Sequence, residues 1–347
     1  MNNHPNHLHL SLWLASALVG AGAAETFTLT DPVIKDLLTN CGSCKVDLDC
    51  GWDLGHIGMP AGVYLKPWAL SLRYDQFDQD RMNSGRSRID LPPGATGIQH
   101  RNVTLDLDYH LTAQWTVSVS LPWVYRKQNE VEIDEDDPAT RIEKRGRFSG
   151  IGDTRVDTQF LFDVAPAQRL GAVIGVKLPT GSTTKRTTET TITNDVVVDQ
   201  GDEPTTWTLN PGNGSTDLII GGILRGDLLE HTLVLFFRPQ VQFALAHRDA
   251  FRPGNRFTVN AGGRWQPVRY VDISLQATGV ILRRDSGERA EAEESGGEFL
   301  TVSPGISFYP LPDWQIYGNY LWQPYNRVNG EQFVVSQGFS FGTAARF

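Results

Sequence analysis

Residues 103–110 read Val-Thr-Leu-Asp-Leu-Asp-Tyr-His, so every second side chain is apolar and each Asp stands between two apolar neighbours. Residues 115–125, Trp-Thr-Val-Ser-Val-Ser-Leu-Pro-Trp-Val-Tyr, repeat the alternation with Thr and Ser in the polar places. Successive side chains of a β-strand point to opposite faces of the sheet. The two stretches therefore predict neighbouring strands that have one apolar face and one polar, partly ionic face.

The same alternation recurs along the chain in segments that start near residues 68, 103, 115, 156, 172, 217, 231, 256, 271, 299, 314 and 333. Short connections, at 112–114, 165–169, 227–230, 268–270 and 310–313, alternate with long polar ones, at 76–101, 127–150, 180–214, 246–255, 284–298 and 326–331. This pattern is typical of transmembrane barrels with short periplasmic turns and long extracellular loops. We expect an all-β, antiparallel, up-and-down transmembrane β-barrel of about 12 strands, closed because lipid satisfies no unpaired backbone group.

Composition and the N-terminal segment indicate where the protein works. The chain of 347 residues has a net charge of −9, which argues against a nucleic-acid partner. Residues 10–24, Leu-Ser-Leu-Trp-Leu-Ala-Ser-Ala-Leu-Val-Gly-Ala-Gly-Ala-Ala, have the length and small-residue end of an export signal, although no Lys or Arg precedes them. No later apolar run approaches the roughly 18 residues of a membrane helix. We expect a signal peptide at 1–24, a periplasmic arm or plug at 25–65 and the barrel at 66–347.

The polar face of the predicted strands repeatedly carries Arg and Asp, as a water-filled lumen would. Aromatic residues gather near both ends of the apolar face, as they do at membrane interfaces. We assign Trp68, Tyr109, Trp115, Trp265, Tyr309 and Trp314 to the turn end, and Tyr74, Trp123, Tyr125 and Trp322 to the loop end. The pattern thus favours an apolar face turned to lipid; the alternative is a secreted β-sandwich or propeller with that face inside.

A barrel of about twelve strands lies between small barrels filled by side chains and porins with aqueous channels. A narrow polar conduit is therefore expected, unless the ionic groups pair and plug it. The predicted lumen-lining residues are Arg73, Asp106, Asp108, His110, Asp153, Arg155, Asp157, Lys177, Arg225, Arg238, Arg264 and Asp272.

The C-terminal segment has Phe333, Val335, Phe339, Phe341 and the final Phe347 in one phase. A last strand that ends in Phe looks like the assembly signal of Gram-negative outer-membrane barrels. This predicts an outer-membrane location reached through the periplasm, with outer-membrane lipid, lipopolysaccharide and the barrel assembly machinery as partners.

Two short motifs carry a resemblance to a known family. Ser149-Gly150-Ile151-Gly152-Asp153, and Gly175-Val176-Lys177-Leu178-Pro179-Thr180-Gly181, resemble the meta-pathway phenol-degradation family of transporter-like outer-membrane barrels over about residues 66–347. The resemblance implies passage of small solutes, including aromatic compounds, and supplies no catalytic residues. Pro122, Pro239 and Pro304 interrupt predicted strands, which indicates a bulge or strand bend at each, or alternatively a lateral opening in the wall.

All three cysteines, Cys41, Cys44 and Cys50, precede the first predicted strand. In an oxidising compartment they favour a disulfide, with a metal or redox site, or a cross-link to another chain, as alternatives. Zinc would need a fourth ligand such as His56 or Asp49. Because some barrels that sheathe cytochromes carry an N-terminal CxxC, a porin-like scaffold of an electron-transfer complex is a second functional hypothesis.

The acidic loops at 127–150 and 284–298 contain carboxylates that could bind Ca²⁺ or Mg²⁺ together with lipopolysaccharide, or simply face water. The Thr-rich segment 180–207 is expected to be a mobile surface loop. An outer-membrane hydrolase is a third hypothesis, since His110 shares a face with Asp106 and Asp108, but no Ser motif accompanies it. We therefore predict a non-enzyme without a cofactor.

Overall fold

The computed structural model describes residues 67–347 except 113, 134–136, 138, 206, 230–231, 247–249, 269 and 312. The predicted signal peptide, the arm and the three cysteines lie outside the described residues, as do His231 and His247. The predictions that rest on them are not tested by this structure.

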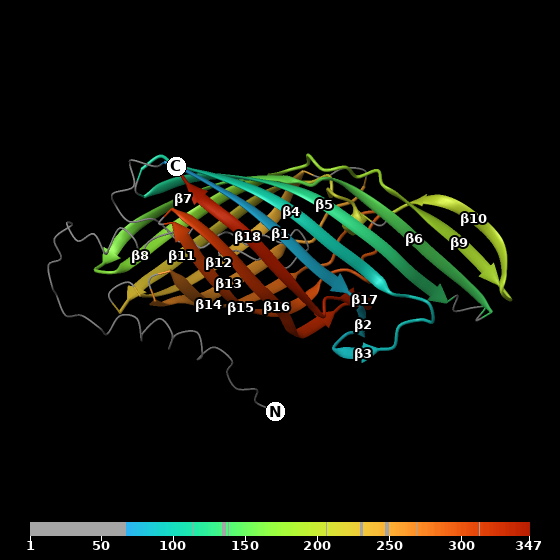
Figure 1. The fold of residues 1–347 in the computed structure, drawn as a ribbon. Coiled ribbons are helices and arrows are strands. Elements are labelled where there is room, and N and C mark those ends of the chain that lie inside the picture. The colour runs from blue at the N-terminus through green and yellow to red at the C-terminus, as the bar shows by residue number, and fades with distance from the viewer. Residues whose placement is uncertain are drawn as a thin grey trace, which may run out of the picture.

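Twelve strands form a closed antiparallel barrel, which confirms the predicted fold class (Figure 1). Neighbours around the ring follow the order β5, β4, β1, β18, β16, β15, β14, β13, β12, β11, β8 and β7, and β7 pairs with β5 again. These strands are β1 (Trp68–Gln79), β4 (Gly97–His110), β5 (Trp115–Ile133), β7 (Thr154–Ala165), β8 (Gln168–Leu178), β11 (Thr216–Leu228), β12 (Leu233–Ala246), β13 (Arg256–Val268), β14 (Val271–Leu282), β15 (Gly297–Leu311), β16 (Trp314–Val328) and β18 (Gln337–Arg346).

The first and last strands of the barrel close the ring. β1 pairs with β18 from Ala69 opposite Arg346 to Asp78 opposite Gln337. The Trp68 amide donates to the Phe347 carbonyl at 3.1 Å, so pairing continues to the last residue. Both ends of the barrel sequence therefore lie at the short-turn end, and the long connections lie at the opposite, loop end.

A further hairpin extends the wall beyond the loop end. β6 (Thr140–Ile151) pairs with the outer half of β5 and with β9 (Arg186–Thr193), which pairs with β10 (Val196–Pro204); this extension points away from the ring in Figure 1. The expectation of a mobile loop at 180–207 was wrong for most of its length. Thr is β-branched and favours strands, but a run of Thr has no apolar alternation to reveal one.

A small second sheet lies at the loop end of β1 and β16. It consists of β17 (Glu331–Val334), β2 (Arg81–Ser84) and β3 (Ser87–Ile89), in that order. The last barrel strand begins at Gln337, so the placement of Phe333 on its lipid-facing phase was wrong. Phe333 belongs to β17 and packs against buried residues of the barrel interior.

As the alternation predicts, apolar side chains cover the outer face of the wall and charged side chains lie on its inner face. A soluble protein has the opposite arrangement. Leu72, Leu105 and Ile174 are 48%, 38% and 55% exposed, whereas Arg73, Asp106 and Arg225 are 0–2% exposed. In addition, Phe339 and Phe341 of β18 are exposed on the outer face. No helix among the described residues is long and apolar enough to cross a membrane.

Aromatic side chains ring the outer face near both ends, with one exception. Trp115 and Trp314 at the short-turn end are exposed and donate from Nε1 to Thr158 at 2.5 Å and to Thr343 at 2.6 Å. Trp123 and Trp322 are exposed near the loop end. Tyr309, however, is buried on the inner face, so its assignment to the outer ring was wrong.

Only one of the three strand prolines coincides with a bulge in the pairing. Across from Pro122, β5 changes its partner from β7 (Ser120 opposite Arg155) to β6 (Trp123 opposite Ile151), which leaves one extra residue on the β6–β7 side. The Gly152 amide donates to the Pro122 carbonyl at 2.8 Å. The pairing of β12 with β13 passes Pro239, and that of β14 with β15 passes Pro304, without a shift in register.

Candidate functional site: the barrel interior

The inner face of β1, β4 and β5 is a wall of paired polar side chains. The register sets Arg73 opposite Thr104 and Ser71 opposite Asp106. Arg73 Nε donates to Asp75 Oδ2 at 2.7 Å, while its Nη1 lies 3.7 Å from Asp106 Oδ2. Because all three charged side chains are buried, leaving any one of them without its partner would be costly.

An Arg-x-Asp pattern builds the same pair at three places around the barrel. Residues i and i+2 of a strand lie on one face about 6.7 Å apart, a distance that an Arg side chain spans. Arg155 pairs with Asp157 at 2.9 Å in β7, and Arg225 pairs with Asp227 at 2.7 Å in β11. Arg73 and Asp75 are the third pair.

The opposite wall has a network around Tyr309. Its hydroxyl donates to Asp272 Oδ2 at 2.5 Å, and Gln315 Nε2 donates to the same hydroxyl at 3.2 Å. Arg264 Nη1 lies 3.3 Å from Asp272 Oδ2. This network joins β13, β14, β15 and β16 near the short-turn end.

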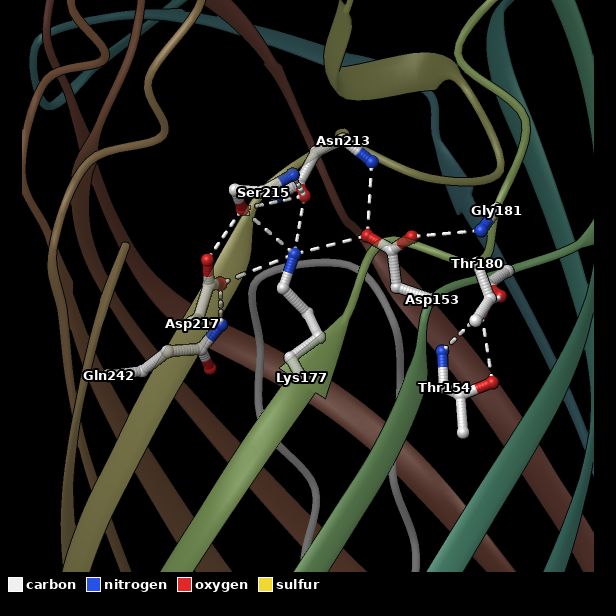
Figure 2. Close-up of polar contacts among 10 residues, drawn as sticks. Asp153, Thr154, Lys177, Thr180, Gly181, Asn213, Ser215, Asp217 and Gln242 are labelled. Atoms are coloured by element: carbon white, nitrogen blue, oxygen red, sulfur yellow. Dashed lines mark hydrogen bonds and ion pairs between the residues drawn. The ribbon is translucent and has the colours of Figure 1, made fainter. Parts of the chain in front are cut away.

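Five residues form what we call the fork cluster: Asp153, Lys177, Asn213, Ser215 and Asp217. Asp153 lies between β6 and β7, Lys177 near the end of β8, Asn213 and Ser215 just before β11, and Asp217 at its start; Figure 2 shows the five side chains converging. Lys177 Nζ lies 3.0 Å from Asp153 Oδ2, 3.2 Å from Asp217 Oδ2 and 3.1 Å from Ser215 Oγ, and it also donates to Asn213 Oδ1.

The fork cluster also ties two connecting segments to the wall. The Asp153 carboxylate accepts from the backbone amides of Gly181 at 3.0 Å and Asn213 at 3.1 Å, as Figure 2 shows. Lys177 and Asp153 belong to the two motifs that carry the family resemblance. The two motifs therefore meet in space, joined by the ion pair between Asp153 of the first motif and Lys177 of the second.

An aromatic and apolar cluster lies toward the loop end of the interior, among polar side chains such as Gln128. The apolar tier consists of Phe77, Ile98, His100, Phe148, Leu209 and Phe333. Ile98, Phe148 and Leu209 are buried together with Phe333 packed against them, and Phe77 stacks on His100 with ring centroids 4.8 Å apart and planes at 9°. Two members come from connecting segments: Leu209 from the 3₁₀ turn η2 (Trp207–Leu209) and Phe333 from β17.

The predicted lumen residues lie on the inner face of the barrel strands, except Asp153, which lies between β6 and β7. Nine of them are buried: Arg73, Asp106, Asp108, Asp153, Asp157, Arg225, Arg238, Arg264 and Asp272. His110, Arg155 and Lys177 are half-buried. His110 Nδ1 lies 2.9 Å from Thr116 Oγ1. Their role as the lining of a conduit is a proposal.

Sequence reasoning missed Asp75, Asp217, Asp227, Tyr309 and the apolar tier. The Arg-x-Asp spacing was a usable signal for Asp75 and Asp227. Leu209 had none, because it lies in a connecting segment without alternation. The alternation around Phe333 was misleading, because it continues across the break between β17 and β18.

The acidic loops do not form a metal site in the part of the chain that is described, where no group of three or more ligating side chains occurs. Glu294 has a raised pKa because it is partly buried, and because Glu291, Glu132 and Glu331 add negative charge nearby. Asp134, Glu135 and Asp136 lie outside the described residues. The cation hypothesis therefore stays a prediction without structural support.

The barrel resembles solved outer-membrane channels. An outer-membrane channel from Pseudomonas putida F1 is 12% identical, with 81% of this chain and 96% of that chain covered at a TM-score of 0.60. A deletion mutant of TodX, a monoaromatic hydrocarbon channel, is 10% identical, with 88% and 99% covered at a TM-score of 0.51. No family model matches the sequence. No curated protein matches it significantly.

At these identities the likeness shows the fold: the chain is a closed transmembrane barrel of the outer-membrane type.

Proposed function

We propose that the protein is an outer-membrane channel through which small solutes, aromatic compounds among them, pass passively along a narrow Arg/Asp-lined lumen. It is a conduit and not an enzyme in this proposal. It resides in the outer membrane of a Gram-negative bacterium after export through the periplasm.

The observation that carries the proposal is the inverted sidedness of a closed wall. Apolar side chains cover the outer face, and buried Arg and Asp side chains occupy the inner face. A soluble barrel would be destabilised by this arrangement, because burying charged groups costs free energy and the exposed apolar face would remain in contact with water. A barrel in lipid has its apolar surface satisfied from outside, and its interior is free to be polar.

The paired charges also define what such an interior would pass. Each Arg–Asp pair is a fixed dipole that presents hydrogen-bond donors and acceptors to the lumen without net charge. Small polar or amphipathic solutes can exchange hydrogen bonds with these groups, whereas a large apolar solute would leave them unsatisfied. The apolar tier at the loop end would meet the solute first and favour those with a ring or short hydrocarbon.

The resemblance of the two motifs supports a narrower proposal, membership of the meta-pathway phenol-degradation family of transporter-like barrels. Both motifs converge on the fork cluster, where Asp153 and Lys177 form an ion pair at 3.0 Å. Outer-membrane lipid, lipopolysaccharide and the barrel assembly machinery remain the proposed partners, with a periplasmic partner proposed for residues 25–65.

Planar bilayers test the channel directly. The purified protein should give single-channel conductance steps. The variant Arg73→Met removes one lumen cation and leaves the negative charges of Asp75 and Asp106 without that guanidinium, so it should raise the preference for cations over anions. Leu72→Met, one residue away on the lipid face, should leave the ion preference unchanged. Membranes that stay silent with correctly folded protein would reject an open pore.

A further inference from the structure

Within the interior, β1 and β4 place four neighbouring residues around unsatisfied hydrogen-bonding atoms. The register sets Phe77 opposite His100, and Asp75 opposite Asn102. All four side chains are at most 2% exposed. Three of their buried polar atoms have no hydrogen-bond partner: His100 Nδ1, Asn102 Nδ2 and Asp75 Oδ1. A buried polar atom without a partner is rare and costs free energy, so three on one patch call for an explanation.

The roles of the three atoms are fixed by their neighbours. Gln79 Nε2 donates to the Phe333 carbonyl at 2.9 Å, so Gln79 Oε1, which lies 2.7 Å from His100 Nε2, must accept the imidazole proton. In the neutral ring His100 Nδ1 is then an acceptor.

The Asn102 amide is oriented in the same way. Its Oδ1 accepts from Arg126 Nη1 at 2.6 Å, so Nδ2 is left as a donor. Asp75 Oδ2 is engaged by Arg73 Nε at 2.7 Å, which leaves Oδ1 as a second acceptor. The patch thus combines one donor and two acceptors beside the Phe77–His100 aromatic stack.

We propose that these four residues form a binding site for a small aromatic solute that carries a neutral hydroxyl group. The ring packs against Phe77 and His100. The hydroxyl donates its proton to His100 Nδ1 or Asp75 Oδ1, and its oxygen accepts from Asn102 Nδ2. This proposal rests on the proposed channel function and names a solute class and a binding site within it.

The chemistry of the site excludes near relatives of such a solute. A carboxylate has no proton to donate and would meet two acceptors, one of them the Asp75 carboxylate. A plain hydrocarbon ring would leave all three polar atoms unsatisfied. Rows of inward residues on a strand are about 6.7 Å apart, so one ring with a hydroxyl on a single carbon reaches from the aromatic pair to the row of Asp75 and Asn102.

Calorimetry on the detergent-solubilised full chain tests this with three probes of one carbon skeleton: benzyl alcohol, toluene and benzoate. Benzyl alcohol should bind at least about tenfold more tightly than either of the others. Asn102→Leu removes the one donor of the site and should abolish that preference. His100→Phe leaves Asp75 Oδ1 as the other acceptor and should weaken the preference. Ser303→Ala should keep it, since Ser303 is likewise a buried residue whose hydroxyl lacks a partner, but it lies on β15.

The outcomes separate this site from the channel. Equal affinity for the three probes overturns the site, even if the protein conducts ions. A preference that is unchanged in both variants also overturns it, provided that heat-dependent gel migration shows an intact barrel. Silent bilayers with selective, variant-sensitive binding of benzyl alcohol reject the channel and leave the site standing.

Discussion

The fork cluster offers the most specific prediction about how the interior is held together. Lys177 is 12% exposed, and its partners Asp153 and Asp217 are 6% and 3% exposed. Replacing Lys177 with Met leaves two carboxylates buried side by side without their cation. Removing one partner of a buried ion pair costs about 3–5 kcal/mol.

The loss should appear locally, because backbone pairing of the barrel does not depend on Lys177. Asp153 accepts from the amides of Gly181 and Asn213, so these two amides report on the cluster. At 1.4 kcal/mol for each factor of ten, hydrogen exchange at both amides should accelerate by about two to four orders of magnitude. Mass spectrometry with fragmentation resolves exchange at this level.

Two further variants make the test selective. Lys144→Met removes an ion pair of similar length, 2.7 Å, with Glu132. Because that Glu is 54% exposed, the stability of the folded protein should fall by less than about 1 kcal/mol. Adding Asp217→Asn to Lys177→Met should recover part of the protection, because one of the two unpaired charges is gone. If Lys177→Met exchanges like the wild type at both amides, the assigned role of the cation is wrong.

Three other changes have expected outcomes. Tyr309→Phe removes a hydrogen bond to the buried Asp272 carboxylate and should lower the free energy of unfolding in urea by about 1.5–3 kcal/mol; an unchanged value would contradict the network. Gly212→Ala should destabilise by about 1–3 kcal/mol, because its Cβ would lie 2.6 Å from Gly181 Cα, whereas Gly279→Ala meets open space and should not destabilise; equal effects would refute the packing argument. Burial raises the pKa of Asp285 above its ordinary value of 3.8, outweighing the Gly254 amide and Arg256, which lower it. The folded loop then binds this proton more tightly than the unfolded loop, so its stability is highest below the ordinary pKa and falls as pH rises through the raised one. Asp285→Asn should remove this fall, which hydrogen exchange at Gly254 across pH 4 to 7 would detect; parallel pH profiles would contradict it.

The barrel could be predicted from the sequence because its wall depends on one periodic feature, the alternation of apolar and polar residues along each strand. Alternation along 103–110 and 115–125 predicts strands, and the Asp and Arg residues on one phase predict the polar interior. Twelve strands and their up-and-down order follow from repeating that reading. Each barrel strand needs only its own residues and its immediate neighbours to be recognised.

The rest of the structure depends on contacts between distant segments, which alternation does not report. Phe333 has the same spacing as Phe339 but lies before a break in the chain, so β17 turns it inward. Tyr309 is one residue out of phase with the exposed Phe308, a distinction that an aromatic count near a strand end does not make. The β9–β10 hairpin lacks apolar alternation because β9 is mostly Thr, and only Thr187 and Ile192 of that strand are buried.

The most direct test of the account is the sidedness of β4 in a lipid bilayer. Nitroxide labels are placed singly at residues 102–107, in a background with Cys41, Cys44 and Cys50 replaced by Ser, and their collisions with oxygen and with a water-soluble nickel complex are measured. Labels at Val103, Leu105 and Leu107 should collide with lipid-dissolved oxygen, while those at Asn102, Thr104 and Asp106 should be shielded from it. Oxygen collisions that peak at the even positions, or show no alternation, would contradict a barrel whose apolar face meets lipid.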